Sequence, residues 1–246
     1  MHRYQILIEY VGTNFVGWQI QSKGKSIQRL IQTKLFKLLK EKILLIGSGR
    51  TDAGVHAEEQ SAHFECKKKI ENLDKFLKSL NYFVNDMNVS IIKIKKRNIN
   101  FHARFSAKQR IYKYVIFNRL SRPSIEKGRG WHIIKKLDIS LMKKGAKKLL
   151  GTKDFSTFRS SSCNAKSSIR TMKSVKIKSI RGRIEIQFKS KSFLQQQVRS
   201  MVGCLKYLAE KKWDLKRFDF VLKSKKRILC APPAPAVGLF LEKVIY

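Results

Sequence analysis

Apolar and polar residues alternate along the first segment of the chain. Residues 3–10 read RYQILIEY, so that every second residue is tyrosine or isoleucine, which is the pattern of a strand with one buried face. Residues 26–40 instead place apolar residues three or four positions apart, and Ser26 stands where a helix N-cap belongs. The pattern predicts a strand followed by an amphipathic helix.

The same two periodicities continue to residue 97. They predict strands over residues 42–47, 60–66 and 88–97, and a second amphipathic helix over residues 72–83 that Asn72 caps. The resulting order is β-α-β-β-α-β, which is the split unit of ferredoxin-like and RRM-like domains.

A similar series of elements is predicted for the rest of the chain. It consists of a strand over 110–118, a helix over 138–151 between Asp138 and Gly151, a hairpin over 171–190, helices over 192–210 and 214–222, and a strand over 238–246. We therefore expect an α/β (α+β) fold with two halves, residues 1–105 and residues 106–246.

The chain is strongly basic. Its 54 lysine and arginine residues outnumber 17 acidic residues, which gives a formal net charge of +37. Such a field attracts a polyanion, either a nucleic acid or an anionic membrane surface. A drifting AT-rich genome would also enrich lysine, and because the lysines are scattered along the chain this second explanation stays open.

The cysteines and the apolar segments bear on the compartment. The four cysteines lie far apart and form no CxxC motif, which favours reduced thiols over a disulfide framework. No signal peptide is recognisable, and no apolar run approaches the roughly 20 residues that span a bilayer. We expect a soluble cytoplasmic protein with no membrane partner.

Residues 47–57, with the sequence GSGRTDAGVHA, form a glycine-rich stretch around a single aspartate. A strand precedes it, so Asp52 is expected on a loop at a strand end, where reactive groups are often held on a rigid scaffold. Its glycines match neither phosphate-binding pattern, G-x-x-x-x-G-K-[ST] or G-x-G-x-x-G. On local sequence alone, Asp52 is either a reactive carboxylate or an ordinary aspartate turn.

No metal site is expected near this stretch. Residues 56–58 read HAE, which fits half of the zinc deaminase signature, but the later P-C-x-x-C is missing. His63 and Cys66 do not join His56 as ligands, because a strand sends the two to opposite faces.

Aromatic and basic residues are interleaved over residues 101–118, with the sequence FHARFSAKQRIYKYVIFN. Such a mixture suits stacking on unpaired bases and contact with phosphates, although alternate rings of a strand also suit a core. Arg199 stands among apolar residues of the helix predicted over 192–210. It either reaches the surface or pairs with a buried carboxylate.

Seven segments together resemble the tRNA pseudouridine synthase A family in order and spacing. They are EYVGTNFVGWQ (9–19), GRTDAGVHA (49–57), FHARFSA (101–107), YKYVI (112–116), LLGTKDFSTFR (149–159), QQVRSMVG (196–203) and GLFLEKV (238–244). The resemblance implies the pseudouridine synthase fold, in which the sheets of two ferredoxin-like or RRM-like halves join around a central basic cleft.

The resemblance also implies an activity. The family isomerises uridine to pseudouridine at positions 38, 39 and 40 of the tRNA anticodon stem-loop, as a homodimer with no cofactor and no metal. Two alternatives remain: a pseudouridine synthase that acts on another RNA, and a non-catalytic RNA-binding protein of the same fold.

The resemblance assigns roles to four residues. Asp52 matches the catalytic aspartate, and Arg199 is expected to pair with it and keep it ionised. Tyr112 is expected to stack on the uracil, and Leu239 to form the apolar floor under the base.

The remaining expected contacts are with the RNA backbone. Arg50 is placed to hold the gap that a flipped uridine leaves. Phosphate contacts are expected from basic residues in and near the aromatic stretch, namely Arg104, Arg110, Lys113 and Arg170.

Two positions depart from the family pattern. Val11 replaces the aspartate of the usual Y-D-G-T, which puts a bracing role for that loop in doubt. Gln197 stands where a methionine is usual, which is expected to change the packing around Arg199.

Overall fold

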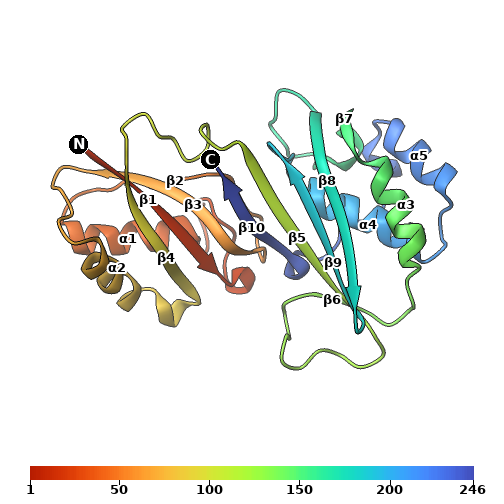
Figure 1. Cartoon of the computed structure of the whole chain (residues 1–246), viewed down its shortest axis with the longest axis horizontal. Helices are drawn as coiled ribbons and strands as arrows, with labels where there is room; N and C mark the ends of the chain where they lie inside the picture. Colours follow the sequence, from red (N-terminus) through yellow and green to blue (C-terminus); the bar gives the residue numbers. More distant parts are fainter. The chain divides into compact units, whose positions relative to one another are not determined.

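The computed structural model describes residues 1–246 and divides them into two compact units. Unit 1 consists of residues 1–108 and 240–246, and unit 2 of residues 109–239. Both ends of the chain therefore belong to unit 1 (Figure 1).

Unit 1 contains a sheet of strand order β4-β1-β3-β10, in which β2 also pairs with β3. The strands are β1 (His2–Tyr10), β2 (Ile46–Gly47), β3 (His56–Cys66), β4 (Val89–Arg97) and β10 (Leu239–Ile245). β1 is antiparallel to both β3 and β4, whereas β10 is parallel to β3. The end of the chain thus supplies a strand to a sheet that the beginning of the chain starts.

Two helices cover one face of this sheet (Figure 1). They are α1 (Ile27–Leu39) and α2 (Leu73–Tyr82). The side chains of Ser26 and Asn72 accept hydrogen bonds from the backbone three residues on, so both predicted N-caps are confirmed. Apolar side chains that alternate along β1 pack against the apolar stripe of α1, and Ile6, Ile8 and Ile31 are fully buried.

Unit 2 contains a sheet of strand order β5-β9-β8-β7, with β6 parallel to β5. Its strands are β5 (Gln109–Asn118), β6 (Trp131–Ile133), β7 (Gly151–Asp154), β8 (Ile169–Ile180) and β9 (Arg183–Ser190). The helices α3 (Ile139–Lys148), α4 (Gln197–Ala209) and α5 (Leu215–Lys223) form a layer on one side of that sheet (Figure 1). Side chains from β5, β9 and α4 form its core, among them Tyr114, Phe188 and Met201.

The predicted α/β class is confirmed, and most predicted elements are present within a residue or two. Four boundaries were wrong. The strand predicted over 60–66 already begins at His56, and the helix predicted over 138–151 ends at Lys148. The strand predicted over 42–47 is reduced to Ile46–Gly47, and the helix predicted over 192–210 begins only at Gln197. Gln196 has a left-handed backbone with φ of 60°, which a right-handed helix cannot include. None of the helices has the length and apolar character needed to cross a membrane.

A short segment packs on β3 through a buried histidine. The ring Nδ1 of His63 accepts a hydrogen bond from the backbone of Ala103 at 3.1 Å, and the Tyr246 hydroxyl lies 2.9 Å from the Ala103 carbonyl. His63 is 2% exposed. Burial, the nearby His102 and the Arg3 guanidinium lower the pKa of His63 from 6.5 to about 4. The imidazole is therefore neutral at pH 7 and fixed as an acceptor.

This histidine predicts that the protein loses stability in mild acid. Because the pKa of His63 is lower in the folded chain than in the unfolded chain, its contribution is fully present above about pH 6.5 and is lost as the pH falls through about 4. A shift of this size is worth about 3 kcal/mol. The melting temperature, measured between about pH 7 and pH 4, should fall less steeply in His63→Gln than in the parent. An identical slope in the two proteins would contradict this, and His132→Gln in unit 2 serves as the control.

Candidate active site

Asp52 lies on the loop that joins β2 to β3 in unit 1. Its carbonyl accepts a hydrogen bond from the Val55 backbone at 3.2 Å, which closes a tight turn over residues 52–55. Gly54, the third residue of that turn, has a positive φ of 77°, which glycine adopts without strain. A backbone turn is thus present at Asp52, whose side chain is partly exposed.

A neighbouring segment supports this loop at its centre. The Trp18 backbone donates to the Thr51 carbonyl at 3.1 Å, and the Tyr10 hydroxyl lies 2.8 Å from the Thr51 hydroxyl. Gly17 has φ of 106°, and a Cβ placed there would lie 2.6 Å from the Thr51 carbonyl oxygen. Only glycine allows this approach, so the backbone before Asp52 is fixed from behind.

A buried histidine supports the end of the same loop. The Gly12 backbone donates to His56 Nδ1 at 3.1 Å, which makes this ring nitrogen an acceptor. The His56 ring stacks on Phe240 with centroids 4.7 Å apart. A Cβ on Gly12 would overlap the Val55 carbonyl. His56, which the HAE pattern first brought forward as a metal ligand, instead braces the loop.

Polar side chains hold the start of the loop. The Ser48 hydroxyl donates to Gln60 Oε1 at 2.7 Å, and Gln60 Nε2 donates to the Gly49 carbonyl at 3.0 Å. Ser48 and Gln60 are both buried. The supported positions leave Arg50 and Ala53 exposed at the tip beside Asp52, and Arg50 Nε lies 3.2 Å from Gln19 Oε1.

Tyr112 lies on β5 of unit 2, opposite Phe188 on β9. Its side chain is 8% exposed, and the Phe193 ring meets it edge-on with centroids 5.1 Å apart. A ring that is packed edge-on keeps a defined orientation, which suits a stacking surface for a base. Phe193 itself lies in the non-helical segment before α4, where the sequence pattern predicted helix.

Arg199 lies near the start of α4 and is partly buried. Its Nε donates to the Ala234 carbonyl at 2.7 Å, while its own carbonyl accepts from the Ala234 backbone at 3.0 Å. Burial raises the pKa of Tyr114, and the positive charge of Arg199 acts in the opposite direction, so the two groups are close. Arg199 is thus anchored within unit 2 through Nε while its side chain stays partly exposed, and its pairing with a carboxylate stays a prediction.

Residues 230–238, which we call the strap, hold Arg199 in place. The Tyr114 hydroxyl donates to the Pro235 carbonyl at 2.8 Å. A Cβ on Gly203 of α4 would overlap the Pro232 carbonyl, and a Cβ on Gly238 would lie 2.6 Å from the Tyr114 ring. The strap therefore runs in close contact with both α4 and β5, and it leads directly into the buried Leu239.

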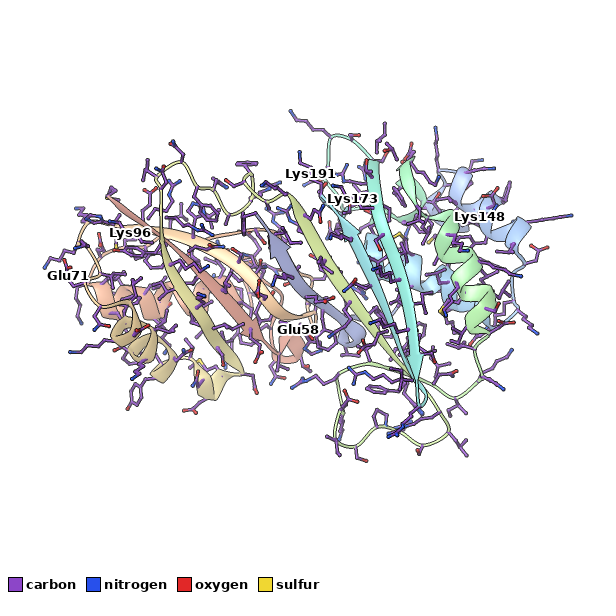
Figure 2. All side chains as sticks on the ribbon, in the orientation of Figure 1. Glu58, Glu71, Lys96, Lys148, Lys173 and Lys191 are labelled. Carbon is purple, nitrogen blue, oxygen red and sulfur yellow. The ribbon has the colours of Figure 1, made fainter.

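The predicted phosphate contacts lie in different surroundings. Arg104 is exposed next to Phe105, which is 74% exposed. Arg110 is buried, and its Nη1 donates to the Lys191 carbonyl. Lys173 and Lys191 lie at the same end of the β8–β9 hairpin and are both exposed (Figure 2).

The other two predicted phosphate contacts are Arg170 and Lys113. Arg170 Nη1 donates to the Ser167 and Ile169 carbonyls, and burial lowers the pKa of its guanidinium. The side chain of Lys113 is partly exposed on β5. The exposed Arg104 is thus the most accessible of the predicted phosphate contacts, and Arg110 the least.

The two departures from the family pattern have local explanations. Val11 donates its backbone N–H to the Asn88 carbonyl at 3.0 Å, so this loop is braced by backbone and needs no aspartate. Gln197 is fully buried, and its Oε1 accepts from the Leu194 backbone at 2.8 Å while its Nε2 has no partner. The glutamine thus shapes the turn that starts α4.

Sequence patterns alone did not single out the supporting residues. Gly12, Gly17 and Trp18 lie in the motif EYVGTNFVGWQ, which carried the resemblance but no structural assignment. The contacts of Phe193 and Ala234 join distant segments. The only signal for the first three was that the motif holds two glycines, Gly12 and Gly17, within six residues.

The chain also matches known proteins over its whole length. The tRNA pseudouridine synthase family matches residues 6–106 and 146–246. The chain is 81% identical over 246 residues to tRNA pseudouridine synthase A of Pelagibacter ubique (strain HTCC1062), with all of both chains covered. It is 41% identical to tRNA pseudouridine synthase A of Paramagnetospirillum magneticum (strain ATCC 700264 / AMB-1), over all of this chain and 96% of that protein.

These matches identify the class of protein that the fold and the aspartate loop define. It is an enzyme, an isomerase that forms pseudouridine. The chain belongs to the tRNA pseudouridine synthase family, and tRNA is its substrate. The alternative of a non-catalytic RNA-binding protein was therefore wrong.

The close approach at Gly17 predicts a specific loss of activity. Gly17→Ala should displace Thr51 and the adjacent Asp52, and should lower pseudouridine formation by about a hundredfold, because misplacing a reacting group by about 1 Å has that effect. Gly128→Ala is the matched control, since Gly128 also has a positive φ, of 72°, but its Cβ would meet nothing within 4 Å. Both variants should lose about 1–2 kcal/mol of stability from backbone strain. Equal turnover in the two variants would contradict the proposed fixing of the loop.

Proposed function

We propose that the protein converts uridine to pseudouridine at positions 38, 39 and 40 of the tRNA anticodon stem-loop, with Asp52 as the catalytic nucleophile. The observation that carries the proposal is the support of the Asp52 loop from behind, through Gly12, Gly17 and His56, while Asp52 itself stays partly exposed. A loop that three residues hold in place, with its aspartate partly exposed, is what a fixed reactive group requires.

The chemistry explains why a carboxylate is needed. Isomerisation breaks the N1–C1′ glycosidic bond, turns the uracil and joins it again through C5, so that no atom is lost and no electron is transferred. A carboxylate can attack the nucleotide, or take the proton that begins an elimination, and in either case it must be ionised. We propose the first route, in which Asp52 is the nucleophile that starts the reaction.

Three residues of unit 2 are proposed to serve the same uridine. Arg199 supplies positive charge, which favours the ionised form of a nearby carboxylate. Its Nε bond to Ala234 sets the direction of the guanidinium, and the remaining donors are directed by that anchor. The ring of Tyr112 stacks on the uracil, oriented by Phe193, and Leu239 provides the apolar floor.

The target uridine must leave its helix before it reacts. Flipping a nucleotide out of a stacked stem costs a few kcal/mol, which contacts to the opened strand can offset. Arg50 is proposed to hold that gap, because it is exposed two residues before Asp52. Phosphate contacts from Arg104, Lys113, Arg110 and Arg170 would add affinity without reading sequence.

We further propose that the enzyme works in the cytoplasm as a homodimer, as the resemblance to its family implies. The leading alternative is a tRNA pseudouridine synthase with a different target position, because contacts to phosphates do not select a base. Mapping of pseudouridine in unmodified tRNA after incubation with the enzyme separates the two. Product at positions 38, 39 and 40 supports the proposal, and product only elsewhere refutes it.

The role of Asp52 predicts the outcome of one substitution. Asp52→Asn keeps the size and shape of the side chain but removes its charge, so pseudouridine formation should fall by on the order of a thousandfold or more. Binding of tRNA, measured by filter retention, should stay within about threefold of the parent, since the phosphate contacts remain. Asp86→Asn, an exposed change in the same unit, is the control. Full activity of Asp52→Asn would show that another group starts the reaction.

The role of Arg199 predicts a split between turnover and binding. Arg199→Ala should lower kcat by about 10²–10³-fold, the effect of removing one charge-stabilising donor, and should change the Kd for tRNA little. Arg199→Lys should recover part of kcat, because it keeps the positive charge. The recovery should be incomplete, because lysine cannot make the Nε bond to Ala234. Arg217→Ala, on the exposed face of α5, is the control. Equal losses in kcat and in affinity would assign Arg199 to phosphate binding instead.

A further inference from the structure

Two cysteine thiols face each other beside the strap. Cys204 lies on α4, one turn after Ser200, and Cys230 is the first residue of the strap. Their sulfur atoms are 3.5 Å apart. Cys204 is fully buried, whereas Cys230 is partly exposed, so a small molecule can reach only one of the two sulfurs.

The surroundings of the pair favour a thiolate at the exposed position. The hydrogen bond between the two thiols, together with the nearby Arg227 guanidinium, lowers the pKa of Cys230. The same contact and burial raise the pKa of Cys204. Arg227 is itself held on α4, because its Nη1 donates to the Ser200 hydroxyl at 2.7 Å. A reactive thiolate beside a resolving thiol is the arrangement of a redox-sensitive cysteine pair.

The other two cysteines lack these features. Burial raises the pKa of the Cys66 thiol to about 11, and its sulfur lies 3.1 Å from the Lys68 carbonyl. Cys163 is buried, and neither it nor Cys66 has a second sulfur as its hydrogen-bond partner. The chain therefore offers one pair prepared for oxidation and two thiols that serve as internal controls.

We propose that Cys204 and Cys230 form a reversible disulfide when the protein meets a hydroperoxide, and that this disulfide slows turnover by displacing the strap at its contact with Arg199. The first part stands on the thiol pair alone. The second part rests on the role proposed above for Arg199.

The chemistry balances with a hydroperoxide as the oxidant and a thiol as the reductant. The Cys230 thiolate attacks the peroxide oxygen, which gives a sulfenic acid on Cys230 and releases the alcohol or, from hydrogen peroxide, water. The Cys204 sulfur then attacks the Cys230 sulfur, the S–S bond forms, the S–O bond breaks and water leaves. Two thiol hydrogens and one peroxide are consumed, and an external dithiol reverses the change by taking the two sulfurs back to thiols.

The disulfide must move the strap. A disulfide bond is about 2.05 Å long, so the two sulfurs approach by roughly 1.5 Å from their present separation. The strap has no free space on its α4 side, because the Pro232 carbonyl already occupies the place of a side chain at Gly203. The movement of Cys230 is therefore passed along the strap to Ala234, which holds both the side chain and the carbonyl of Arg199.

The experiment treats the full-length protein with hydrogen peroxide and then with dithiothreitol. The treated protein should lose the mass of two hydrogen atoms, and peptide mapping should show a link between Cys204 and Cys230. The kcat for pseudouridine formation should fall roughly three- to tenfold, as expected for one weakened hydrogen bond, and should return after reduction. Cys163→Ser is the matched control and should behave as the parent does.

Two variants keep the outcome decisive. Cys230→Ser and Cys204→Ala should each resist the loss of kcat, and if Cys204→Ala does not fold, Cys230→Ser alone decides. A disulfide that involves Cys66 or Cys163, or no disulfide at all, would refute the proposal that Cys204 and Cys230 form the bond. A Cys204–Cys230 disulfide that leaves kcat unchanged would refute the second part, that the disulfide slows turnover through Arg199. Because the link is read from mass, it stands apart from the proposed catalytic roles, whose failure would show in Asp52→Asn and Arg199→Ala instead.

Discussion

The position of the Asp52 loop depends on contacts between backbones that only glycine permits. At Gly12 and Gly17 a short segment comes so close to the Asp52 loop that any side chain would displace it. The resulting hydrogen bonds run from backbone to backbone or to a buried histidine, and they involve no flexible charged side chain. A carboxylate held in this way pays little entropy when the substrate arrives, because its loop is already ordered.

The same device recurs in unit 2. Gly203 and Gly238 let the strap lie against α4 and β5, and the strap in turn fixes the guanidinium of Arg199. Each unit thus fixes one loop or side chain by close packing of main chain. The strong positive charge is distributed differently, because most of it is carried by exposed lysines that no such packing holds.

Much of the fold follows from local patterns in the sequence. The alternation in β1 and the caps at Ser26, Asn72 and Asp138 predicted to within a residue where their elements begin, because periodicity and capping act over a few positions. The start of α4 was wrong because apolar spacing continues through Phe193 and Leu194, although Gln196 takes a left-handed backbone that the spacing cannot reveal.

Some residues of the candidate site could also be found from the sequence, whereas the contacts that hold them could not. Asp52 stands out in its glycine-rich run, and the resemblance to a family brought Tyr112 and Arg199 forward. The contacts that orient them were not predictable, because Phe193, Ala234 and Phe240 reach them from distant segments of the chain. Contacts between residues far apart in the sequence form only when the chain folds, so local sequence patterns do not predict them.

The strand β10 has a consequence for how the protein is made. Residues 240–246 pair with β3 and complete unit 1, almost 180 positions after the strand that they join. While the ribosome is still producing unit 2, β3 lacks its parallel neighbour and presents unsatisfied backbone groups along that side. The aspartate loop leads straight into β3, so a nascent chain completes the sheet beside this loop only after all of unit 2 has been synthesised.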